Sequence, residues 1–482
     1  MKNGRRIAGN LVSLFSGEAV SSALAFVITI LLARRLSDEG FGRLAFVQAI
    51  MVYLLLAVDL GLSTFGTREI ARQPEHLHEI AGQILTMRLL MAGLVAVPLA
   101  IGIIFWPMAP AMRWLYWGSL LGLFTQALNP EFIFQGLERM SGVAAWRVLV
   151  HFFYLLLIFL LVLGLEELWI VTLLRTIAEA VTLFVLVLWV KQRYGFQFYL
   201  KWLPDSWKKF LRESLVMAAS VVVIKIYYTF DTFMLGLMDR PEAVGWYQAS
   251  YKVVLLFIGL AGMVQMAFGP AFARSSKSES LDSTVKLFAT AQYIIAIMAT
   301  SFLVCLNQEL IQILFGAGYS ESIKCLAILA YSMFFVFIGT IFMAPLLFVG
   351  KHKEYLLIVS SGAIVNVVLN LVLIPKFSID GAAIATTISN ISMMLLALKE
   401  YHAFSSRKGA ISYTVKWVMV FLFFNIVFVR LWGGGIIPFT LTLAFTLVTY
   451  ALFNLAYIKR FSGELISIFQ SLSESRFSIK RK

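Results

Sequence analysis

The feature that most constrains the fold of this chain is a series of long apolar runs, each about 20 residues in length and with few charges. We count about fourteen such runs along the sequence. A soluble protein would have about 45–50% apolar and about 25% charged residues, whereas this chain is 60% hydrophobic and 14% charged. Strands of outer-membrane barrels alternate over about 10 residues and do not form continuous runs. The sequence therefore predicts an all-α, polytopic membrane protein with about 14 transmembrane helices.

The order of apolar and polar segments predicts two halves of six helices each, followed by two further helices. We place the runs near residues 10–33, 43–65, 81–106, 114–135, 143–165, 168–190, 213–237, 244–270, 285–306, 325–349, 355–374, 381–400, 413–431 and 436–457. This order divides the chain into an N-terminal lobe (1–195), a basic cytoplasmic linker (196–212), a C-terminal lobe (213–405), helices 13 and 14 (406–458) and a basic cytoplasmic tail (459–482).

The lysine and arginine residues indicate on which side of the membrane each loop lies. With the N-terminus inside, roughly 28 of them fall in inner segments and roughly 8 in outer ones. The inner residues include Arg68, Arg139 and Arg147, together with the linker and the tail. This bias predicts a protein of the inner (plasma) membrane whose N- and C-termini are both cytoplasmic. The net charge of +14 therefore indicates topology and contact with anionic lipid rather than nucleic-acid binding.

A weak internal repeat relates the two halves. The first pair of matching segments is Leu32-Ala33 … Glu39 … Gly42 and Leu235-Gly236 … Glu242 … Gly245. The second pair, at the inner end of the fourth run of each half, is Pro130 … Gly136 … Arg139 and Pro345 … Gly350 … Lys353. Transporters built from such repeats bind their substrate between the repeats and alternate between inward and outward access.

Lys225 lies near the middle of the seventh apolar run, with Asp231 about two turns later. A charge at this depth costs at least ~2.5 kcal/mol on insertion scales, so it normally faces the protein interior or a wet cavity. Two interpretations are open: a lysine that binds anionic cargo, and a lysine that is neutralised by a buried acid. Residues six apart on a straight helix do not share a face, which favours the cavity. The mid-span basic residues together predict a cationic substrate-binding cavity formed by Lys225, Arg88, Lys252 and Arg175.

Some of the polar residues within the runs have a structural interpretation as well. Arg88 lies about two turns into the third run, so its side chain could extend to the lipid headgroups instead of binding substrate. Arg175 precedes Glu179 by four residues on the sixth run, a spacing that favours an internal ion pair. Asn366 and Asn370 share one face of the eleventh run, where they could contact a sugar or form hydrogen bonds between helices, and we favour the hydrogen bonds.

A transporter coupled to Na⁺ or H⁺ needs a carboxylate that binds the ion in one of its states. Asp59 and Glu18 are single acids of the first half with this potential, although Asp59 could also be a solvated helix end or the partner of Arg68. Arg34 and Arg35 end the first run on the outer side, where nearby acids could neutralise them or the pair could form an outer gate. The candidate coupling or gating residues are Asp59, Asp231, Glu18, Glu179, Arg34 and Arg35.

The sequence offers no motif for covalent catalysis or for a bound cofactor. It contains no Gly-x-x-x-x-Gly-Lys-Ser/Thr segment, and so gives no basis for ATP hydrolysis. Cys305 and Cys325 have no metal-ligand spacing, and His76 and His78 lie in a polar inner loop. We therefore expect a transporter that is not an enzyme and that holds no metal or cofactor.

Several stretches resemble one family of membrane transporters. They are Leu31-Leu32-Ala33-Arg34-Arg35-Leu36 with Gly40-Phe41-Gly42, Asp59-Leu60-Gly61-Leu62 with Gly66-Thr67-Arg68-Glu69-Ile70-Ala71-Arg72, Asn129-Pro130-Glu131-Phe132-Ile133-Phe134-Gln135-Gly136-Leu137-Glu138-Arg139-Met140, and Asp231-Thr232-Phe233-Met234-Leu235-Gly236 with Val244-Gly245-Trp246-Tyr247. The third is similar to a Pro-x-Trp-x-x-Gln-Gly-x-Glu element of the family, with Phe132 in place of the tryptophan. Over nearly its whole length the chain resembles the Wzx-type oligosaccharide flippases, or polysaccharide biosynthesis proteins, of the multidrug/oligosaccharidyl-lipid/polysaccharide (MOP) exporter superfamily.

The resemblance implies a V-shaped fold of two six-helix lobes plus two C-terminal helices. It also implies transport, without covalent chemistry, of an isoprenoid (undecaprenyl-type) pyrophosphate-linked oligosaccharide across the lipid bilayer from the cytoplasmic to the outer leaflet. The implied protein partner is polysaccharide polymerase or ligase machinery.

Two alternatives within the superfamily stay open: a cation-coupled multidrug exporter and a peptidoglycan-precursor lipid flippase. A drug site for cations should be acidic or aromatic, so the mid-span basic residues favour anionic cargo. A membrane glycosyltransferase or polymerase would need large outer loops, and the predicted outer loops are short.

Overall fold

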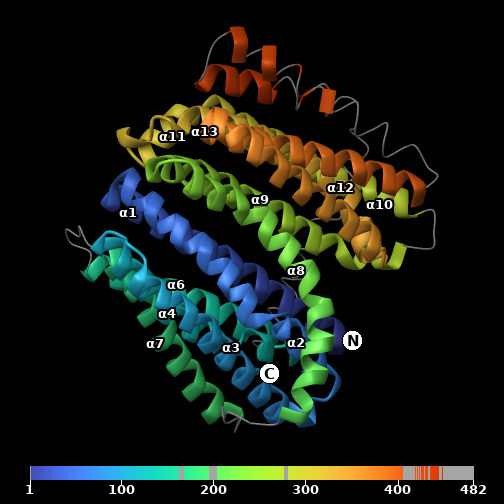
Figure 1. The fold of residues 1–482 in the computed structure, drawn as a ribbon. Helices are drawn as coiled ribbons and strands as arrows, with labels where there is room; N and C mark the ends of the chain where they lie inside the picture. Colours follow the sequence, from blue (N-terminus) through green and yellow to red (C-terminus); the bar gives the residue numbers. More distant parts are fainter. Residues whose placement is uncertain are drawn as a thin grey trace. The chain divides into compact units, whose positions relative to one another are not determined.

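The structure of the chain, a computed structural model, describes residues 2–161, 168–194, 204–275 and 280–404, with shorter stretches at 418–419, 421, 423, 425–427, 429–431, 435–444 and 448. These residues are helical almost throughout and contain no strand (Figure 1), which confirms the predicted all-α fold. The predicted tail lies outside the described residues, as do most of the predicted helices 13 and 14 and much of the linker.

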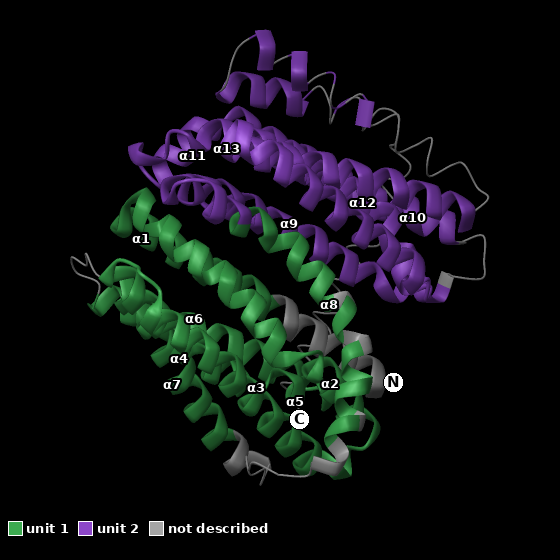
Figure 2. Cartoon of the chain, in the orientation of Figure 1, with its two compact units in different colours: residues 1–233 green, residues 234–482 purple. Residues whose placement is uncertain are grey.

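The chain forms two compact units, Met1–Phe233 and Met234–Lys482, which we call unit 1 and unit 2 (Figure 2). The boundary falls inside one helix, α8 (Pro204–Met238), so that all but the last few residues of this helix belong to unit 1. The division made from the sequence places the boundary in the segment 196–212, of which 204–212 forms the start of α8.

The helices follow one another with short connections. Unit 1 contains α1 (Lys2–Asp59), α2 (Leu62–Arg72), η1 (Pro74–His76), α3 (Leu77–Phe105), α4 (Pro110–Ala127), α5 (Glu131–Gly136), α6 (Met140–Leu161), α7 (Leu168–Tyr194) and most of α8. Unit 2 continues with α9 (Pro241–Ser275), α10 (Ser280–Cys305), α11 (Asn307–Leu314), η2 (Ala317–Tyr319), α12 (Ser322–Phe348) and α13 (His352–Phe404).

Two of these helices, α1 and α13, each contain two predicted runs. α1 leaves the helical conformation at Ser37 (φ 61°, ψ 176°), and a straight helix of its 58 residues would be ~87 Å long, about three times the hydrocarbon thickness. α13 breaks at Ser378 (φ 51°, ψ −128°). Its two halves then pack together, because the Asn366 amide donates to Thr386 Oγ1 at 3.5 Å. This bond across the break confirms the predicted hydrogen bonding between helices. Within the first half, Asn370 donates to Asn366 Oδ1 at 3.0 Å.

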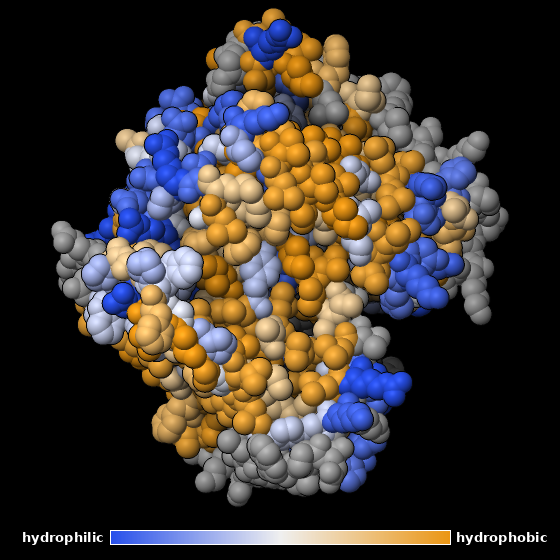
Figure 3. Space-filling model, in the orientation of Figure 1, coloured by the Kyte–Doolittle hydropathy of each residue, from blue (hydrophilic) through white to orange (hydrophobic). Residues whose placement is uncertain are grey.

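Nine helices in the described part of the chain are long and apolar enough to cross a membrane. Since α1 and α13 hold two predicted runs each, these nine account for eleven of the first twelve runs, and α4 accounts for the other. Their outward faces are apolar: Leu94 is 70% exposed, Phe105 79% and Phe159 72%. Figure 3 shows apolar surface (orange) over much of the molecule. Apolar surface of this extent is typical of contact with lipid, and the chain is a multi-pass membrane protein.

Two of the stretches that carry the family resemblance meet at one end of unit 1. The amphipathic helix α2 packs on the short helix α5, where Thr67 Oγ1 donates to the Phe132 carbonyl at 3.4 Å and to Gln135 Oε1 at 3.3 Å. Gly136 permits this approach, because a Cβ atom there would lie only 2.7 Å from Ile70 Cβ. The buried core around the contact includes Leu62, Phe65, Ile84, Phe134 and Trp146.

The ends of α5 and α12 share the same C-terminal cap, which supports the internal repeat. In both, a left-handed residue follows the helix: Glu138 (φ 55°) after α5 and Gly350 (φ 90°) after α12. The hydrogen bond that defines a Schellman motif is 2.8 Å in each, from the N–H of Arg139 to Phe134 and from the N–H of Lys351 to Leu346. When the two caps are aligned, Gly350 corresponds to Glu138. The alignment made from the sequence, which pairs Gly350 with Gly136, is therefore shifted by two residues.

Candidate functional site

A connected set of charged and amide side chains lies within unit 1, and we call it the unit 1 polar network. Its members are Glu18, Asp59, Arg88, Thr125, Gln126, Asn129, Glu131, Arg147, Arg175 and Glu179. Arg88 lies about 11 residues, or ~17 Å, from the start of α3 and ~26 Å from its end. The network is therefore at a depth where water is scarce and unpaired charge is costly.

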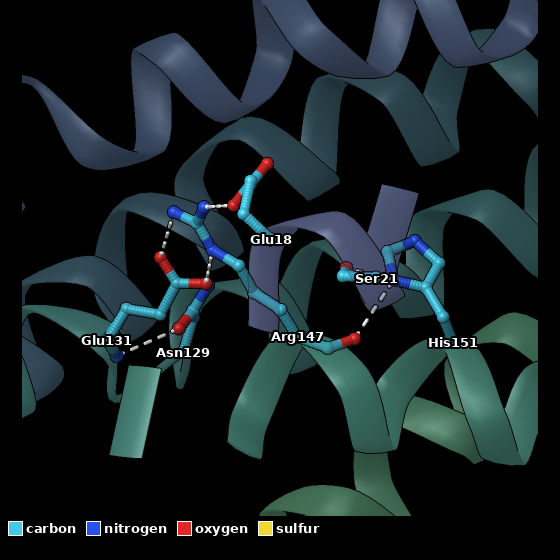
Figure 4. A network of polar contacts seen from close by, with 6 residues as sticks. All are labelled: Glu18, Ser21, Asn129, Glu131, Arg147 and His151. Carbon is cyan, nitrogen blue, oxygen red and sulfur yellow. Dashed lines mark hydrogen bonds and ion pairs between the residues drawn. The ribbon is translucent and has the colours of Figure 1, made fainter. Parts of the chain in front are cut away.

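Arg147 of α6 joins two acids from different helices (Figure 4). Its Nε and Nη2 donate to the two carboxylate oxygens of Glu131 at 2.9 and 3.0 Å, a bidentate fork. Its Nη1 donates to Glu18 Oε2 of α1 at 2.5 Å. Asn129 Oδ1 accepts the backbone N–H of Glu131 at 2.9 Å, which fixes the first turn of α5. Pro130 lacks an N–H, so the chain breaks between α4 and α5 at this point.

Arg88 of α3 also binds at the break between α4 and α5. Its Nη2 donates to the carbonyl of Gln126 at 2.7 Å and its Nη1 to the carbonyl of Asn129 at 3.2 Å. Carbonyl groups at the end of a helix have no partner within the helix and carry partial negative charge, so a cation there is stabilising. The Nε of Arg88 lies 3.3 Å from Asp59 Oδ1, and the side chain is only 7% exposed. Arg88 is thus a positioning residue for the α4–α5 break, and the predicted extension to the headgroups is wrong.

Asp59 ends α1 and has the local partner Ser63, whose backbone N–H and hydroxyl both donate to Asp59 Oδ1. The predicted pairing of Asp59 with Arg68 is wrong. Arg68 instead pairs with Glu213 of α8 at 2.5 Å and with Glu69 at 3.0 Å. Burial lowers the pKa of Arg68, but these two carboxylates raise it by more, and the net effect is a raised pKa.

Glu179 of α7 is the most deeply buried acid of the network, at 2% exposure. It accepts hydrogen bonds from Thr125 Oγ1 at 2.6 Å, from the Gln126 amide and from Arg175 Nε at 3.3 Å. The predicted Arg175–Glu179 pair is confirmed. Gln126 connects the two parts of the network, because its side chain binds Glu179 while its backbone carbonyl binds Arg88.

The network also shows that α1 folds back at Ser37. Glu18 and Asp59 are about 40 residues apart, which would be ~60 Å in a straight helix, yet both contact the α4–α5 break through one arginine each. Close packing supports the N-terminal half of α1 against α6, since a Cβ on Gly17 would lie 2.3 Å from Ala144 Cβ.

His151 lies one turn after Arg147, beside the network. Its Nδ1 lies 2.9 Å from the Arg147 carbonyl oxygen and 2.9 Å from Ser21 Oγ (Figure 4). Because a carbonyl oxygen can only accept a hydrogen bond, Nδ1 of His151 carries the ring hydrogen. In the neutral ring, Nε2 is then the nitrogen without a hydrogen. His151 therefore ties α6 to the first half of α1 a turn away from the Glu18–Arg147 pair.

The charges of the network nearly cancel, because three arginines face four carboxylates. Arg147 and Arg175 are 35% and 46% exposed, Glu18 40%, while Arg88 and Glu179 are buried. Half-exposed charges at this depth are not compatible with lipid contact, so this face of unit 1 must line water or protein.

Lys225 differs from the paired arginines. It is exposed, and its side chain makes no ion pair with any residue that the structure describes. Asp231, six residues later on α8, is 2% exposed, so the two side chains point in different directions, as predicted. Lys252, on α9 in unit 2, is half-buried and interacts with neighbouring groups.

Arg34 and Arg35 are both exposed, just before the break of α1 at Ser37. Glu39, one of the two acids expected to neutralise them, pairs with Arg43 at 2.5 Å. No group of three or more His, Cys, Asp or Glu side chains is arranged for a metal within the residues searched, which are the described ones.

The sequence interpretation missed Arg147, Glu131 and His151 as members of the site. Arg147 was assigned to an inner loop because it lies near the start of its run, but α6 begins at Met140 and places Arg147 two turns inside. The signal that could have identified it is the pattern of Arg147 and His151 at i and i+4 within an apolar run, which places both on one helix face.

Comparisons with known proteins agree with this architecture. Residues 7–276 match the family model described as "Polysaccharide biosynthesis protein". The chain is 26% identical over 400 residues to the "Putative O-antigen transporter" of Shigella dysenteriae, covering 81% of this chain and 98% of that protein.

Among solved structures, it is similar to "Lipid II flippase MurJ, inward closed conformation", with a TM-score of 0.65, 16% identity and coverage of 93% of this chain and 100% of that one. It is also similar to a multidrug resistance MATE family transporter of the MOP superfamily in an inward-facing conformation, with a TM-score of 0.63, 14% identity and coverage of 80% and 95%.

The two structural similarities are at low identity and show the fold. The family model spans the whole of α9 and all of unit 1 except its first residues, and it includes the whole unit 1 polar network. The chain therefore belongs to the polysaccharide biosynthesis protein family.

Proposed function

We propose that this protein is a flippase that moves an isoprenoid pyrophosphate-linked oligosaccharide from the cytoplasmic to the outer leaflet of the inner membrane, by alternating access and with both termini in the cytoplasm. Membership of the polysaccharide biosynthesis family and the O-antigen transporter relative support this proposal. The observation that carries it is Lys225, an exposed cation in the middle of a membrane-crossing helix that no described acid neutralises.

In this proposal Lys225 binds the pyrophosphate, because a compact ammonium in a low-dielectric site attracts phosphate more strongly than it does in water. Arg175 is a second contact, since within the described residues only its Nε is bonded and its side chain is 46% exposed. Lys252 is a third candidate. Arg88 acts indirectly, because both of its Nη groups are used by backbone carbonyls.

The unit 1 polar network suggests how an ion could be coupled to transport. Each of its acids is held by an arginine. Binding of Na⁺ or H⁺ at Glu18 or Asp59 would compete with an arginine of another helix and loosen that contact. At Glu179 it would compete with the Thr125 and Gln126 donors of α4. Asp231, buried on α8, is a further candidate. Arg34 and Arg35, exposed at the break of α1, are the candidates for an outer gate.

Thermal stabilisation of the purified protein tests the proposed cargo. A ligand present at about 100 times its dissociation constant stabilises the folded state by about 2.7 kcal/mol. We expect a rise in Tm with a prenyl-pyrophosphate oligosaccharide, a smaller one in Lys225→Gln, and a full response in Lys208→Gln, whose exposed lysine lies near the start of the same helix. A rise with cationic drugs and none with the pyrophosphate lipid would contradict the proposal.

One observation favours a second candidate, a cation-coupled multidrug exporter. The unit 1 polar network holds four carboxylates against three guanidinium groups, and an acidic site suits a cationic ligand. The drug arm of the same experiment separates the two functions, and a peptidoglycan-precursor lipid in a third arm separates the two kinds of lipid cargo.

A further inference from the structure

We propose that the face of unit 1 shared by the second half of α1 and by α8 binds the sugar nearest to the pyrophosphate of the cargo. This inference rests on the proposed function and assigns the two parts of a glycosyl pyrophosphate to neighbouring side chains: the pyrophosphate to Lys225 and the sugar to a set of aromatic rings. We call this set the aromatic cluster, and it consists of Phe46, Tyr53, Phe230 and Phe233.

The contacts between α1 and α8 place the cluster within about two helical turns of Lys225 along α8. Phe46 and Tyr53 of α1 contact Phe233 of α8, with ring centroids 6.3 and 5.3 Å apart. Two residues past the end of α1, a Cβ on Gly61 would lie 2.9 Å from the backbone nitrogen of Ala218 on α8. Residue numbers thus rise along α1 while they fall along α8, so the two segments are antiparallel. Lys225 lies between these two contacts, about 12 Å along the helix from Phe233.

The exposure pattern of α8 shows which of its faces is available to a ligand. Tyr227 is 8% exposed and Asp231 2%, so they form the side of the helix that packs inward. Lys225 is exposed and Tyr228 is 38% exposed. These two residues are three apart and therefore neighbours on one helix face. Phe46, Tyr53, Phe230 and Phe233 are half-buried, so that part of each ring is accessible.

The chemistry of this face fits a glycosyl pyrophosphate better than it fits lipid tails. A lysine in the middle of a membrane-crossing helix is unfavourable against acyl chains, and it gains from a phosphate. Aromatic side chains present a flat apolar face, and Tyr228 adds a hydroxyl that can donate a hydrogen bond. A sugar ring has both apolar C–H faces and hydroxyl groups, and so can use both features.

The test compares two ligands: the glycosylated prenyl pyrophosphate and the same prenyl pyrophosphate without sugar. Dissociation constants are measured for the full-length wild-type protein, for Tyr53→Leu/Phe233→Leu, for Tyr53→Phe and for Lys225→Gln. The control is Phe152→Leu, which removes an aromatic ring that is 48% exposed on α6. Thermal unfolding of each variant establishes that it is folded.

We expect Tyr53→Leu/Phe233→Leu to bind the glycosylated lipid roughly tenfold more weakly, while its affinity for the lipid without sugar stays unchanged. Tyr53→Phe retains the ring and should bind as the wild type does, as should Phe152→Leu. Lys225→Gln should lose affinity for both ligands, since both carry the pyrophosphate.

Two outcomes separate the inference from the proposed function. If the wild type binds the glycosylated lipid and the aromatic variant binds it equally well, the glycan subsite is wrong and the flippase proposal stands. If the wild type binds neither pyrophosphate lipid, the proposed function itself fails. An equal loss for both ligands in the aromatic variant would assign the cluster to the prenyl pyrophosphate and would also overturn the glycan subsite.

Discussion

The guanidinium of Arg88 shows why the charge of a residue alone does not define its role in this membrane protein. Two of its nitrogens donate to the backbone carbonyls of Gln126 and Asn129, and a third faces Asp59. A lysine would keep the positive charge but could not form this planar set of contacts. At the scale of the residue, geometry decides between a substrate-binding role and a positioning role.

Replacement of Arg88 by lysine tests this assignment. We expect Arg88→Lys to lower the free energy of unfolding by about 1–3 kcal/mol, because the carbonyls of Gln126 and Asn129 lose the guanidinium donors. Equilibrium unfolding in detergent measures the change, and Arg72→Lys, at a side chain that is 64% exposed, should change it by less than about 0.5 kcal/mol. An Arg88→Lys variant as stable as the wild type would show that the carbonyl contacts do not hold the α4–α5 break.

Glu179 provides a second test at this scale. Glu179→Ala leaves the Thr125, Gln126 and Arg175 donors without their acceptor, and we expect a loss of about 3 kcal/mol in the free energy of unfolding. The control is Glu309→Ala, at an exposed position of α11. Loss of stability by Glu179→Ala no greater than that of the control would contradict the network as described.

The ion pairs that could be predicted from the sequence are the local ones. Arg175 and Glu179 follow from helical spacing alone. Glu18 and Arg147 are 129 residues apart, and no periodicity relates them, because their contact depends on how α1 folds back and packs on α6. The same holds for Asp59, whose partner Arg88 is on α3, whereas the neighbouring Arg68 points toward Glu213 of α8.

At the scale of the element, the apolar runs located the long helices of the described residues but not the short helices next to them. The run at 43–65 covers both the end of α1 and the start of α2, and the run at 114–135 covers most of α4 and of α5. The breaks fall at Gly61 (φ 78°) and at Pro130, residues that commonly interrupt helices. Hydrophobicity alone cannot show such breaks, because the short helices α2 and α5 each bury an apolar face against the other.

The contact between α2 and α5 gives the prediction for this scale. We expect Gly136→Ala to destabilise the protein by about 1–3 kcal/mol, because the added methyl group would overlap Ile70. The matched substitution is Gly93→Ala in α3, where a Cβ meets nothing within 4 Å and where alanine should be neutral or stabilise the helix by up to about 1 kcal/mol. Thermal unfolding of both variants measures the difference, and equal effects would mean that α2 and α5 are not closely packed in the folded protein.

At the scale of the whole molecule, the pairing of charges changes the interpretation of a cationic cavity. Of the four basic residues predicted to form it, Arg88 and Arg175 are paired with acids, and Lys252 interacts with its neighbours. Lys225 is exposed and has no described acidic partner. The proposed function therefore depends on Lys225 far more than on a general excess of positive charge. Neutralising Lys225 should impair transport without impairing folding.

The most direct test of this account is a translocation measurement in vesicles that contain the purified protein and a labelled prenyl-pyrophosphate oligosaccharide. The label becomes accessible to an enzyme added outside the vesicles as the lipid crosses the bilayer. We expect the wild type and Lys208→Gln to move the lipid well above the rate in protein-free vesicles, and Lys225→Gln to slow this movement by roughly tenfold or more. A folded wild-type protein that moves the lipid no faster than empty vesicles do, or a Lys225→Gln variant with the wild-type rate, would contradict the account.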